Sequence, residues 1–314
     1  MLFLSRADVE ARLDLDALIA ALAPAMVDLS SGAASSPARI VAQVPGAGGF
    51  LGAMPGYVPS IGVLMAKLVS LFPHNTDLPT HQALIVAFDP ETGEPTAVMD
   101  GTAITALRTG AGSALSARVL AAPDASVLAI LGTGVQARSH ARAVCRVRPI
   151  TEIRIAGRDP GRARAAADEL ADLAATVRPV DSYAEALAGA HIACATTHSV
   201  EPVVRREWLD PGTHVTSVGF NAAGREVDDA TVAEALVVVE SRAAALAPHP
   251  GGASDLLGPL RDGIITDDLP ELGEIISGAR PGRRDPAQIT LYKSVGVAVQ
   301  DAAAVGLVLQ NIDV

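Results

Sequence analysis

The hydrophobic positions follow two different patterns along the chain. Before about residue 100, apolar residues first recur at helical spacing and then alternate along short strands that glycine or proline interrupts. These patterns predict helices over 6–13 and 15–32 and strands over 38–45, 50–58, 62–72, 83–88 and 95–99. Ser5 is the predicted cap of the first helix, and Asp14 or Asp16 that of the second. The last two strands form a hairpin, so this part is predicted to be an antiparallel sheet flanked by helices.

A long helix over 102–121, rich in alanine, glycine and serine, leads into the second pattern. From Ser126 onward, short apolar strands alternate with helical stretches. The six strand candidates cover 127–131, 152–157, 176–180, 191–197, 214–220 and 235–240. This alternation predicts a doubly wound parallel sheet of the Rossmann type with the strand order 3-2-1-4-5-6.

The C-terminal segment returns to longer elements. It predicts a helix over 269–278, a strand over 289–293 and an apolar helix over 294–310. The last helix has more apolar surface than an exposed tail can carry, so we expect it to pack on the first domain. We therefore predict an α/β protein with a discontinuous α+β domain (1–118 and 292–314) and a dinucleotide-binding Rossmann domain (119–291).

Composition narrows the class of protein. The chain has 314 residues, of which 49% are hydrophobic and only 3% aromatic, as expected for a parallel sheet wrapped in helices. A net charge of −11 argues against a nucleic-acid surface. The N-terminus turns charged at once, without a signal peptide, and no apolar run reaches the length of a membrane span. Cys145 and Cys194 are expected to be buried thiols in a reducing compartment, so we expect a soluble cytoplasmic protein.

The most informative motif follows the apolar run 127–131. It reads Gly132-Thr133-Gly134-Val135-Gln136-Ala137 and opens a helical segment. In a dinucleotide fingerprint the first glycine permits the turn, the second lets the backbone approach a pyrophosphate, and the alanine allows close packing of helix on strand. The motif predicts a nicotinamide or flavin dinucleotide site; the alternative is an ordinary glycine-rich turn between strand and helix.

The end of the second strand bears on the choice of cofactor. An acidic residue there would select NAD, but the strand ends in Gly157-Arg158-Asp159. Arg158 can pair with a 2′-phosphate, so NADP(H) is favoured and NAD(H) stays possible through Asp159, which can equally cap the next helix. Thr196 and Thr197 follow the fourth strand, where side chains either line the cofactor crevice or only make the loop polar.

Three cations stand in apolar or small-residue surroundings in the first domain: Arg39, Lys67 and Arg108. Lysine occurs only twice in the chain, as Lys67 and Lys293. A cation within an apolar strand is costly unless it meets an anion, so the three are candidates to bind an α-carboxylate. The alternative is surface arginines and a lysine whose stem crosses apolar surface.

Several motifs together resemble the ornithine cyclodeaminase / μ-crystallin family, which also contains alanine dehydrogenases and ketimine or pyrroline-carboxylate reductases. They are Pro37–Arg39, Met54-Pro55, Lys67–Ser70, Phe88-Asp89 with Gly93, Asp100–Arg118, Gly132–Ala137, Val218–Asn221, Glu226–Asp228 and Lys293–Gly296. Leu107–Ala111 is the most specific piece. The resemblance implies a homodimer whose first domain holds the substrate pocket and the dimer interface.

By the same resemblance, Arg39, Lys67 and Arg108 correspond to ligands of the substrate carboxylate, with Lys67 close to the reacting centre and Thr80 near the pocket. Positions expected to approach the cofactor are Thr109, Val218, Gly219, Lys293 and Gly296, besides Gly132, Gly134, Val135, Gln136, Arg158, Thr196 and Thr197. No metal site is expected, because the seven histidines are scattered.

Asn221 departs from the family, in which cyclodeaminases and the related alanine dehydrogenases carry aspartate after the fifth strand. Asparagine is no general base, whereas an imine reductase only needs to bind a protonated imine beside a reduced nicotinamide. The predicted function is therefore an NAD(P)H-dependent reductase of imino acids, or an amino-acid dehydrogenase, with Lys67, Arg108 and Asn221 in catalytic positions. The alternatives are an ornithine-type cyclodeaminase with tightly bound NAD and a non-catalytic NADP-binding protein like μ-crystallin. The substrate's side chain cannot be read from the sequence.

Overall fold

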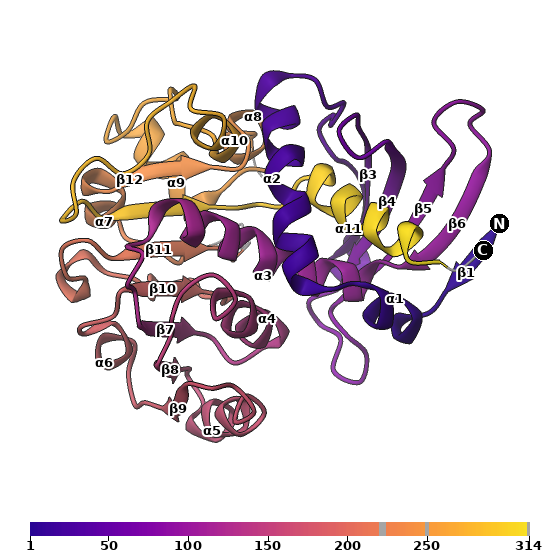
Figure 1. The fold of residues 1–314 in the computed structure, drawn as a ribbon. Helices are drawn as coiled ribbons and strands as arrows, with labels where there is room; N and C mark the ends of the chain where they lie inside the picture. Colours follow the sequence, from indigo (N-terminus) through magenta and orange to yellow (C-terminus); the bar gives the residue numbers. More distant parts are fainter. Residues whose placement is uncertain (220–223, 249–250, 313–314) are drawn as a thin grey trace. The chain divides into compact units, whose positions relative to one another are not determined.

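The computed structural model describes residues 1–219, 224–248 and 251–312. It confirms the predicted α/β class and divides the chain into two compact units. Unit 1 contains residues 1–108 and 297–314, and unit 2 contains residues 109–296 (Figure 1). The sequence placed these boundaries at 118/119 and 291/292.

Unit 1 is built on a six-stranded sheet in the order β1-β6-β5-β4-β3-β2. Its strands are β1 (Leu2–Leu4), β2 (Ile40–Val44), β3 (Gly49–Val58), β4 (Val63–Leu71), β5 (His81–Phe88) and β6 (Pro95–Asp100). All neighbours pair antiparallel except β1 and β6. The predicted strands and the hairpin are therefore confirmed.

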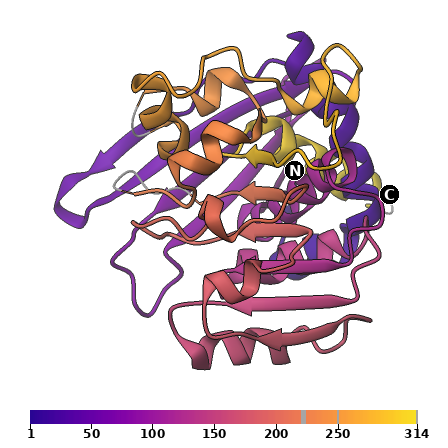
Figure 2. The same ribbon diagram turned by 90° about the vertical axis from the view of Figure 1, so that its left-hand side faces the viewer.

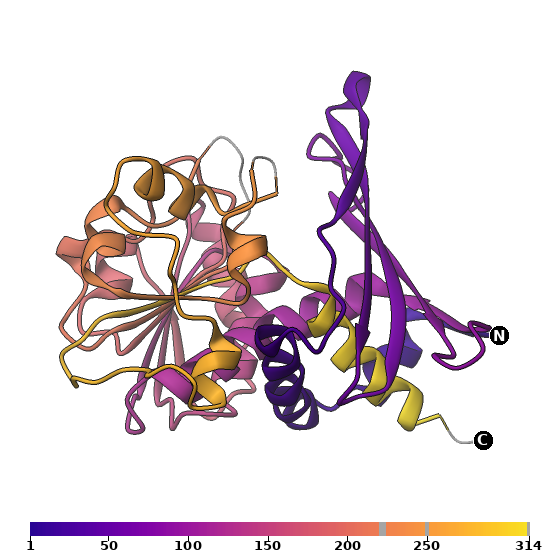
Figure 3. The same cartoon turned by 90° about the horizontal axis from the view of Figure 1, so that it is seen from above.

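Two long helices, α2 (Leu15–Ser31) and α11 (Ala298–Gln310), cover one face of this sheet. Ser5 caps α1 (Arg6–Arg12), and Asp14, rather than Asp16, caps α2 (Leu15–Ser31). The last helix, α11 (Ala298–Gln310), lies in unit 1 and packs on α2, β3 and β4 (Figure 3). A Cβ on Gly56 would lie 2.9 Å from the Cβ of Ala298, so glycine on β3 allows this close approach.

The opposite face of the sheet carries exposed apolar side chains. The register places Ile40, Ala53, Leu68 and Leu84 in one row across β2, β3, β4 and β5. Ile40 is 71% exposed, Leu84 52% and Leu68 39%. We call this row, together with Leu51 on β3, the apolar sheet face.

Unit 2 holds a seven-stranded, wholly parallel sheet (Figure 2). Its strands are β7 (Val127–Leu131), β8 (Glu152–Ala156), β9 (Thr176–Pro179), β10 (Ile192–Ala195), β11 (His214–Ser217), β12 (Leu236–Val239) and β13 (Thr290–Lys293). Its helices are α4 (Val135–Val144), α5 (Pro160–Asp168), α6 (Tyr183–Leu187), α7 (Asp229–Glu234), α8 (Arg242–Ala245), α9 (Ser254–Arg261) and α10 (Leu272–Ile276).

The strand order, β12-β13-β11-β10-β7-β8-β9, corrects the predicted 3-2-1-4-5-6 at one place. The strand predicted over 289–293 inserts between the fifth and sixth strands, pairing with both β11 and β12. All four of its residues are buried, as expected for an inner strand of a parallel sheet that helices cover on both faces. A domain boundary at residue 291 would cut through it.

Helix α3 (Gly101–Leu120) crosses the other boundary. From Thr109 onward it packs within unit 2, where Ser113 Oγ lies 2.8 Å from His140 Nε2 of α4 and Ser116 Oγ lies 3.1 Å from His214 Nε2 of β11. A Cβ on Gly110 would collide with Ser139, which explains why this position of the helix is a glycine. Residues 109–118 therefore belong to unit 2 rather than to the first domain.

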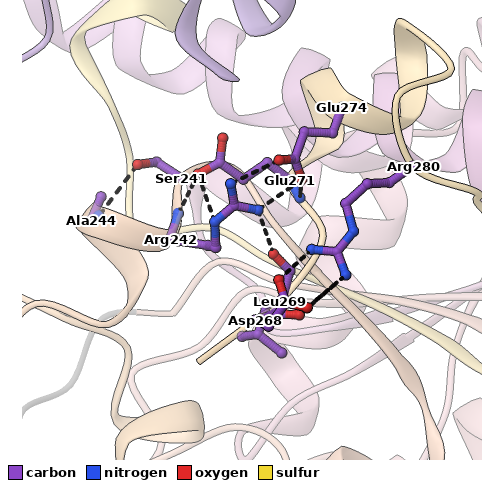
Figure 4. Close-up of polar contacts among 8 residues, drawn as sticks. All are labelled: Ser241, Arg242, Ala244, Asp268, Leu269, Glu271, Glu274 and Arg280. Atoms are coloured by element: carbon purple, nitrogen blue, oxygen red, sulfur yellow. Dashed lines mark hydrogen bonds and ion pairs between the residues drawn. The ribbon is translucent and has the colours of Figure 1, made fainter. Parts of the chain in front are cut away.

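The long connection between β12 and β13 is held by an arginine network. Both Nη atoms of Arg242 lie 2.7 Å from the Glu274 carboxylate, and its Nη1 also donates to the carbonyl of Leu269 (Figure 4). Arg280 pairs with Asp268 at 2.7 Å. Bidentate pairs fix orientation as well as distance, so this network directs the chain back towards β13.

Candidate active site

Lys67 lies on the buried face of β4, in register between Met54 of β3 and Ile85 of β5. It alternates with buried Met65 and Val69 and is itself only 1% exposed. Its Nζ donates to Oδ1 of Asp301, on α11, at 3.0 Å. The lysine is therefore a buried cation with an internal anion as partner.

Arg108, at the last position of unit 1, reaches the same carboxylate. Its Nε donates to Asp301 Oδ1 at 3.1 Å, and its Nη1 donates to Gln300 Oε1 at 2.7 Å. The arginine is 5% exposed and Asp301 is fully buried. Oδ1 of Asp301 thus binds both Lys67 and Arg108. Oδ2 of Asp301 is buried without a hydrogen-bond partner among the described residues.

The cluster carries more positive than negative charge. Arg39, half-buried just before β2, adds to the repulsion that Lys67 experiences from Arg108. Burial lowers the pKa of Lys67 to about 8, although the Asp301 carboxylate opposes this shift. Burial would raise the pKa of Asp301, but Arg108 and Lys67 outweigh it and the pKa is lowered. Two cations share this one carboxylate and Arg39 acts on one of them, so the cluster can accept a further anion.

Sequence reasoning missed Asp301 and Gln300. A signal was present, because Asp301 is the only charged residue between Lys293 and Asp313 and stands in an otherwise apolar helix. A buried carboxylate needs a cation, and that need could have paired it with Lys67.

Thr80 does not join this cluster. It is exposed ahead of β5, and its carbonyl accepts from the Phe72 amide at 2.8 Å. The nearest register pair, Leu71 with His81, lies four residues along β4 from Lys67, roughly 13 Å away at the usual rise per strand residue.

The glycine motif of unit 2 forms the expected turn between β7 and α4. Gly132 has φ of +124°, and a Cβ there would lie 2.6 Å from Thr196 Oγ1. Gly134 is the N-cap of α4, without a side-chain cap, and no described atom lies within 4 Å of the place of its Cβ. Val135 is 61% exposed at the first helical position. The open backbone amides and the space beside Gly134 fit a bound pyrophosphate.

Two side chains of α4 bear on this turn. Arg138 donates from Nη1 to the carbonyls of Thr133 (2.8 Å) and Gly134 (3.1 Å), and its Nη2 pairs with Glu169 at 2.6 Å. The sequence did not single out Arg138, which holds the carbonyls of Thr133 and Gly134 by hydrogen bonds. Gln136 Oε1 is buried without a partner among the described residues.

The residues after β8 and β10 have distinct surroundings. Arg158 is exposed, whereas Asp159 accepts from the amides of Gly161 and Arg162 as the N-cap of α5. Capping is therefore the role that the structure gives Asp159. Thr196 donates its hydroxyl to the Leu131 carbonyl at 3.0 Å and so closes the β7 turn from the neighbouring strand.

A buried carboxylate holds the loops that follow β10 and β11. Glu226 Oε1 accepts from the amide and hydroxyl of Thr197 at 2.5 and 2.8 Å. Its Oε2 accepts from Ser217 Oγ at 2.8 Å and from the Gly219 amide at 2.7 Å. The Thr197 hydroxyl is therefore already engaged with Glu226. Sequence reasoning used Glu226 only as a family motif and missed this role.

Lys293, the second lysine, is fully buried in the same network. Its Nζ lies 2.7 Å from Asp255 Oδ2 and 2.9 Å from both Ser217 Oγ and the Gly219 carbonyl. Asp255 Oδ1 in turn accepts from the amide of Glu226 at 2.7 Å. The ammonium of Lys293 thus binds three groups of the protein, and one of them is the backbone carbonyl of Gly219.

Four candidates of the predicted site remain. Thr109 is half-buried in α3, and the Val218 amide donates to Ala195 at 3.2 Å. Gly296 is buried with φ of +83°. Asn221 lies outside the described residues.

Within 1–219, 224–248 and 251–312, no group of histidine, cysteine or acidic side chains could hold a metal ion. In the same part of the chain, no helix is long and apolar enough to cross a membrane.

Comparison with known proteins places the chain. The model of the ornithine cyclodeaminase/mu-crystallin family matches residues 1–313. The chain belongs to this family. Ketimine reductase mu-crystallin of Mus musculus is 38% identical over 317 residues, which cover 98% of this chain and 96% of the relative.

Two solved structures share the complete fold. Delta(1)-pyrroline-2-carboxylate reductase of Thermococcus litoralis, in complex with NADH and L-proline, has a TM-score of 0.94 and 37% identity, covering 99% of this chain and 97% of that one. An archaeal alanine dehydrogenase dimer with bound NAD has a TM-score of 0.90 and 30% identity, covering 99% and 95%. Family members at this level of similarity thus include enzymes that bind nicotinamide cofactors.

Proposed function

We propose that this protein is an NAD(P)H-dependent reductase of imino acids that carry an α-carboxylate, or equivalently an amino-acid dehydrogenase working in the reverse direction. The observation that carries the proposal is the convergence of Lys67 and Arg108 on one buried carboxylate, with Arg39 nearby. The excess positive charge suits a carboxylate ligand. The names of the related ketimine and pyrroline-carboxylate reductases support the same chemistry.

Each cation has a task in this reaction. Arg39 and Arg108 bind the substrate carboxylate and orient the C=N bond. Lys67 hydrogen-bonds to the nitrogen and donates its proton there as the double bond is reduced. With a pKa of about 8, Lys67 is mainly an ammonium at neutral pH and still gives up a proton readily. The nicotinamide cofactor, when bound, supplies the hydride that the imine carbon accepts.

Unit 2 offers the cofactor site. The α4 amides after Gly134 would hold the pyrophosphate, and Arg138 and Thr196 keep the turn in shape. Exposed Arg158 would pair with a 2′-phosphate, while Asp159 is engaged as a helix cap. NADP(H) is therefore the favoured cofactor. NAD(H) is the alternative, and it is supported by two related structures that contain NADH or NAD.

The assembly proposed for this enzyme is a homodimer. The apolar sheet face leaves Ile40, Leu68 and Leu84 exposed in one row, and an exposed apolar patch of this kind suits a protein interface. The related alanine dehydrogenase is described as a dimer. A cytoplasmic location accompanies the proposal, because Cys145 and Cys194 are both free thiols.

One assay tests the function directly. NADPH and NADH oxidation would be followed with pyruvate plus an amine, with pyrroline-2-carboxylate and with piperideine-2-carboxylate, while ammonia release from ornithine is measured in parallel. Oxidation that depends on an imino acid supports the reductase. Ammonia release without net cofactor oxidation would establish a cyclodeaminase instead, and tight cofactor binding with no turnover would establish a binding protein.

A further inference from the structure

We propose that Asp301 is the positioning residue of the reductase: its Oδ1 holds the Lys67 ammonium and the Arg108 guanidinium side by side and keeps the lysine protonated for its task. The inference rests on the proposed function for the role of Lys67 as proton donor. The contact itself is a property of unit 1.

Both cations are held by the same oxygen atom. Lys67 comes from β4, Arg108 from α3 and Asp301 from α11, and the two donors reach one oxygen at 3.0 and 3.1 Å. Gln300, the residue before Asp301, accepts a hydrogen bond from Nη1 of Arg108 through its Oε1 at 2.7 Å. Two adjacent residues of α11 therefore orient Arg108, and one of them also orients Lys67.

Among the residues that the structure describes, Asp301 is the negative group that acts on Lys67. The charged groups that act on the lysine are Asp301 from α11, Arg108 from α3 and Arg39 from the segment before β2. Its register neighbours on the adjacent strands, Met54 and Ile85, carry no charge. Loss of the carboxylate would leave Lys67 buried among positive charges only, which favours the neutral amine.

The chain provides a matched control in its other lysine. Lys293 is also buried, and it also pairs with an aspartate, Asp255, at 2.7 Å. Asp255→Asn breaks an equivalent pair in unit 2 and reports the general effect of removing a buried carboxylate. Asp301→Asn breaks the pair in unit 1 and conserves the shape of the side chain.

The test is a titration of the two lysines in the intact protein. Lysine labelled with ¹³C at the ε carbon gives two NMR signals, which Lys293→Arg assigns. We expect the Lys67 signal to titrate near pH 8 in the unmodified protein. In Asp301→Asn the midpoint should fall by about 1–3 pH units, the usual effect of a close opposite charge, and in Asp255→Asn it should stay in place. An unchanged midpoint in Asp301→Asn would overturn the proposal.

A second variant covers the case in which Asp301→Asn does not fold. Asp301→Glu keeps the charge but displaces the oxygen by one methylene, so we expect the Lys67 midpoint to stay near 8 while kcat falls at least tenfold. Wild-type kcat in this variant would refute the positioning role. The lysine titration needs no substrate, so it tests the effect of Asp301 on the protonation of Lys67 even if no imino acid is reduced.

Discussion

Lys67 Nζ lies 3.0 Å from Oδ1 of Asp301, a residue 234 positions further along the chain. The contact joins the middle of β4 to the first turns of α11, so the C-terminal helix supplies a polar group to the cluster as well as apolar packing. Burial lowers the pKa of Lys67 to about 8, and the contact with Asp301 opposes this shift and so helps the lysine to keep its proton.

The pH dependence of activity follows from this lysine. Because burial lowers the pKa of Lys67 to about 8, the proton-donating form is lost as the pH rises through that value. We expect kcat/KM for imine reduction to be level on the acid side of pH 8 and to fall about tenfold per pH unit above it.

Lys67→Ala should lower kcat by about 10²–10⁴-fold while the Kd for the cofactor stays within about threefold. Equal losses of turnover and cofactor affinity would instead mark Lys67 as a structural residue.

The two glycines of the β7–α4 turn should respond differently to alanine. Gly132→Ala places a side chain at φ of +124° and against Thr196, so the free energy of unfolding should fall by at least about 1–3 kcal/mol. Gly134→Ala has extended backbone and open space, so it should unfold at the same urea concentration as the unmodified protein but bind the cofactor at least tenfold more weakly. Undiminished cofactor binding by Gly134→Ala would place the pyrophosphate elsewhere.

Arg158 should set the choice between the two nicotinamide cofactors. Arg158→Ala removes a charge-assisted contact to a 2′-phosphate, so the Kd for NADPH should rise about ten- to hundredfold and that for NADH hardly at all. Fluorescence titration with each cofactor measures the ratio. Arg164→Ala, which removes an exposed arginine of α5, is the control for a change in overall charge. A ratio that Arg158→Ala leaves unchanged removes the basis for preferring NADP(H).

The apolar sheet face should be needed for dimerisation. Leu68→Arg combined with Leu84→Arg puts two charges into one cross-strand row, and a buried interface tolerates unpaired charges poorly. Sedimentation velocity should show the variant as a monomer at concentrations where the unmodified protein is a dimer. Ile264→Arg changes an equally apolar, 38% exposed residue of unit 2 and should leave the dimer intact. If the double variant sediments like the control, another surface forms the interface.

Two buried histidines of unit 2 should make the fold sensitive to mild acid. Burial lowers the pKa of His140 to about 4 and that of His214 to about 3, from an ordinary value of 6.5. Below pH 6.5 the unfolded chain therefore takes up protons that the folded chain refuses, and stability falls as the pH falls from 6.5 towards 4. The slope is about 1.4 kcal/mol per pH unit for each histidine. Urea unfolding of His214→Asn between pH 6.5 and 5 should show about half the slope of the unmodified protein.

Where local chemistry decides a feature, the sequence was a sufficient guide. The turn at Gly132 needs a positive φ, and short apolar runs such as those of unit 2 are typical of buried parallel strands, so both could be predicted. Lys67 could be singled out because a cation in an apolar strand demands an anion. The identity of that anion could not, since charge pairing says nothing about which of the chain's 35 acidic residues returns to β4.

The tertiary structure decided the features that depend on contacts distant in sequence. The place of β13 between β11 and β12 follows from pairing on both of its edges, which periodicity along the chain does not encode. Lys293 is the other of the two lysines and also lies in an apolar strand, but its partners are Asp255 and the Gly219 carbonyl in unit 2. A sequence records which groups must be neutralised or buried, while only the folded chain selects their partners, because a contact depends on distance in space.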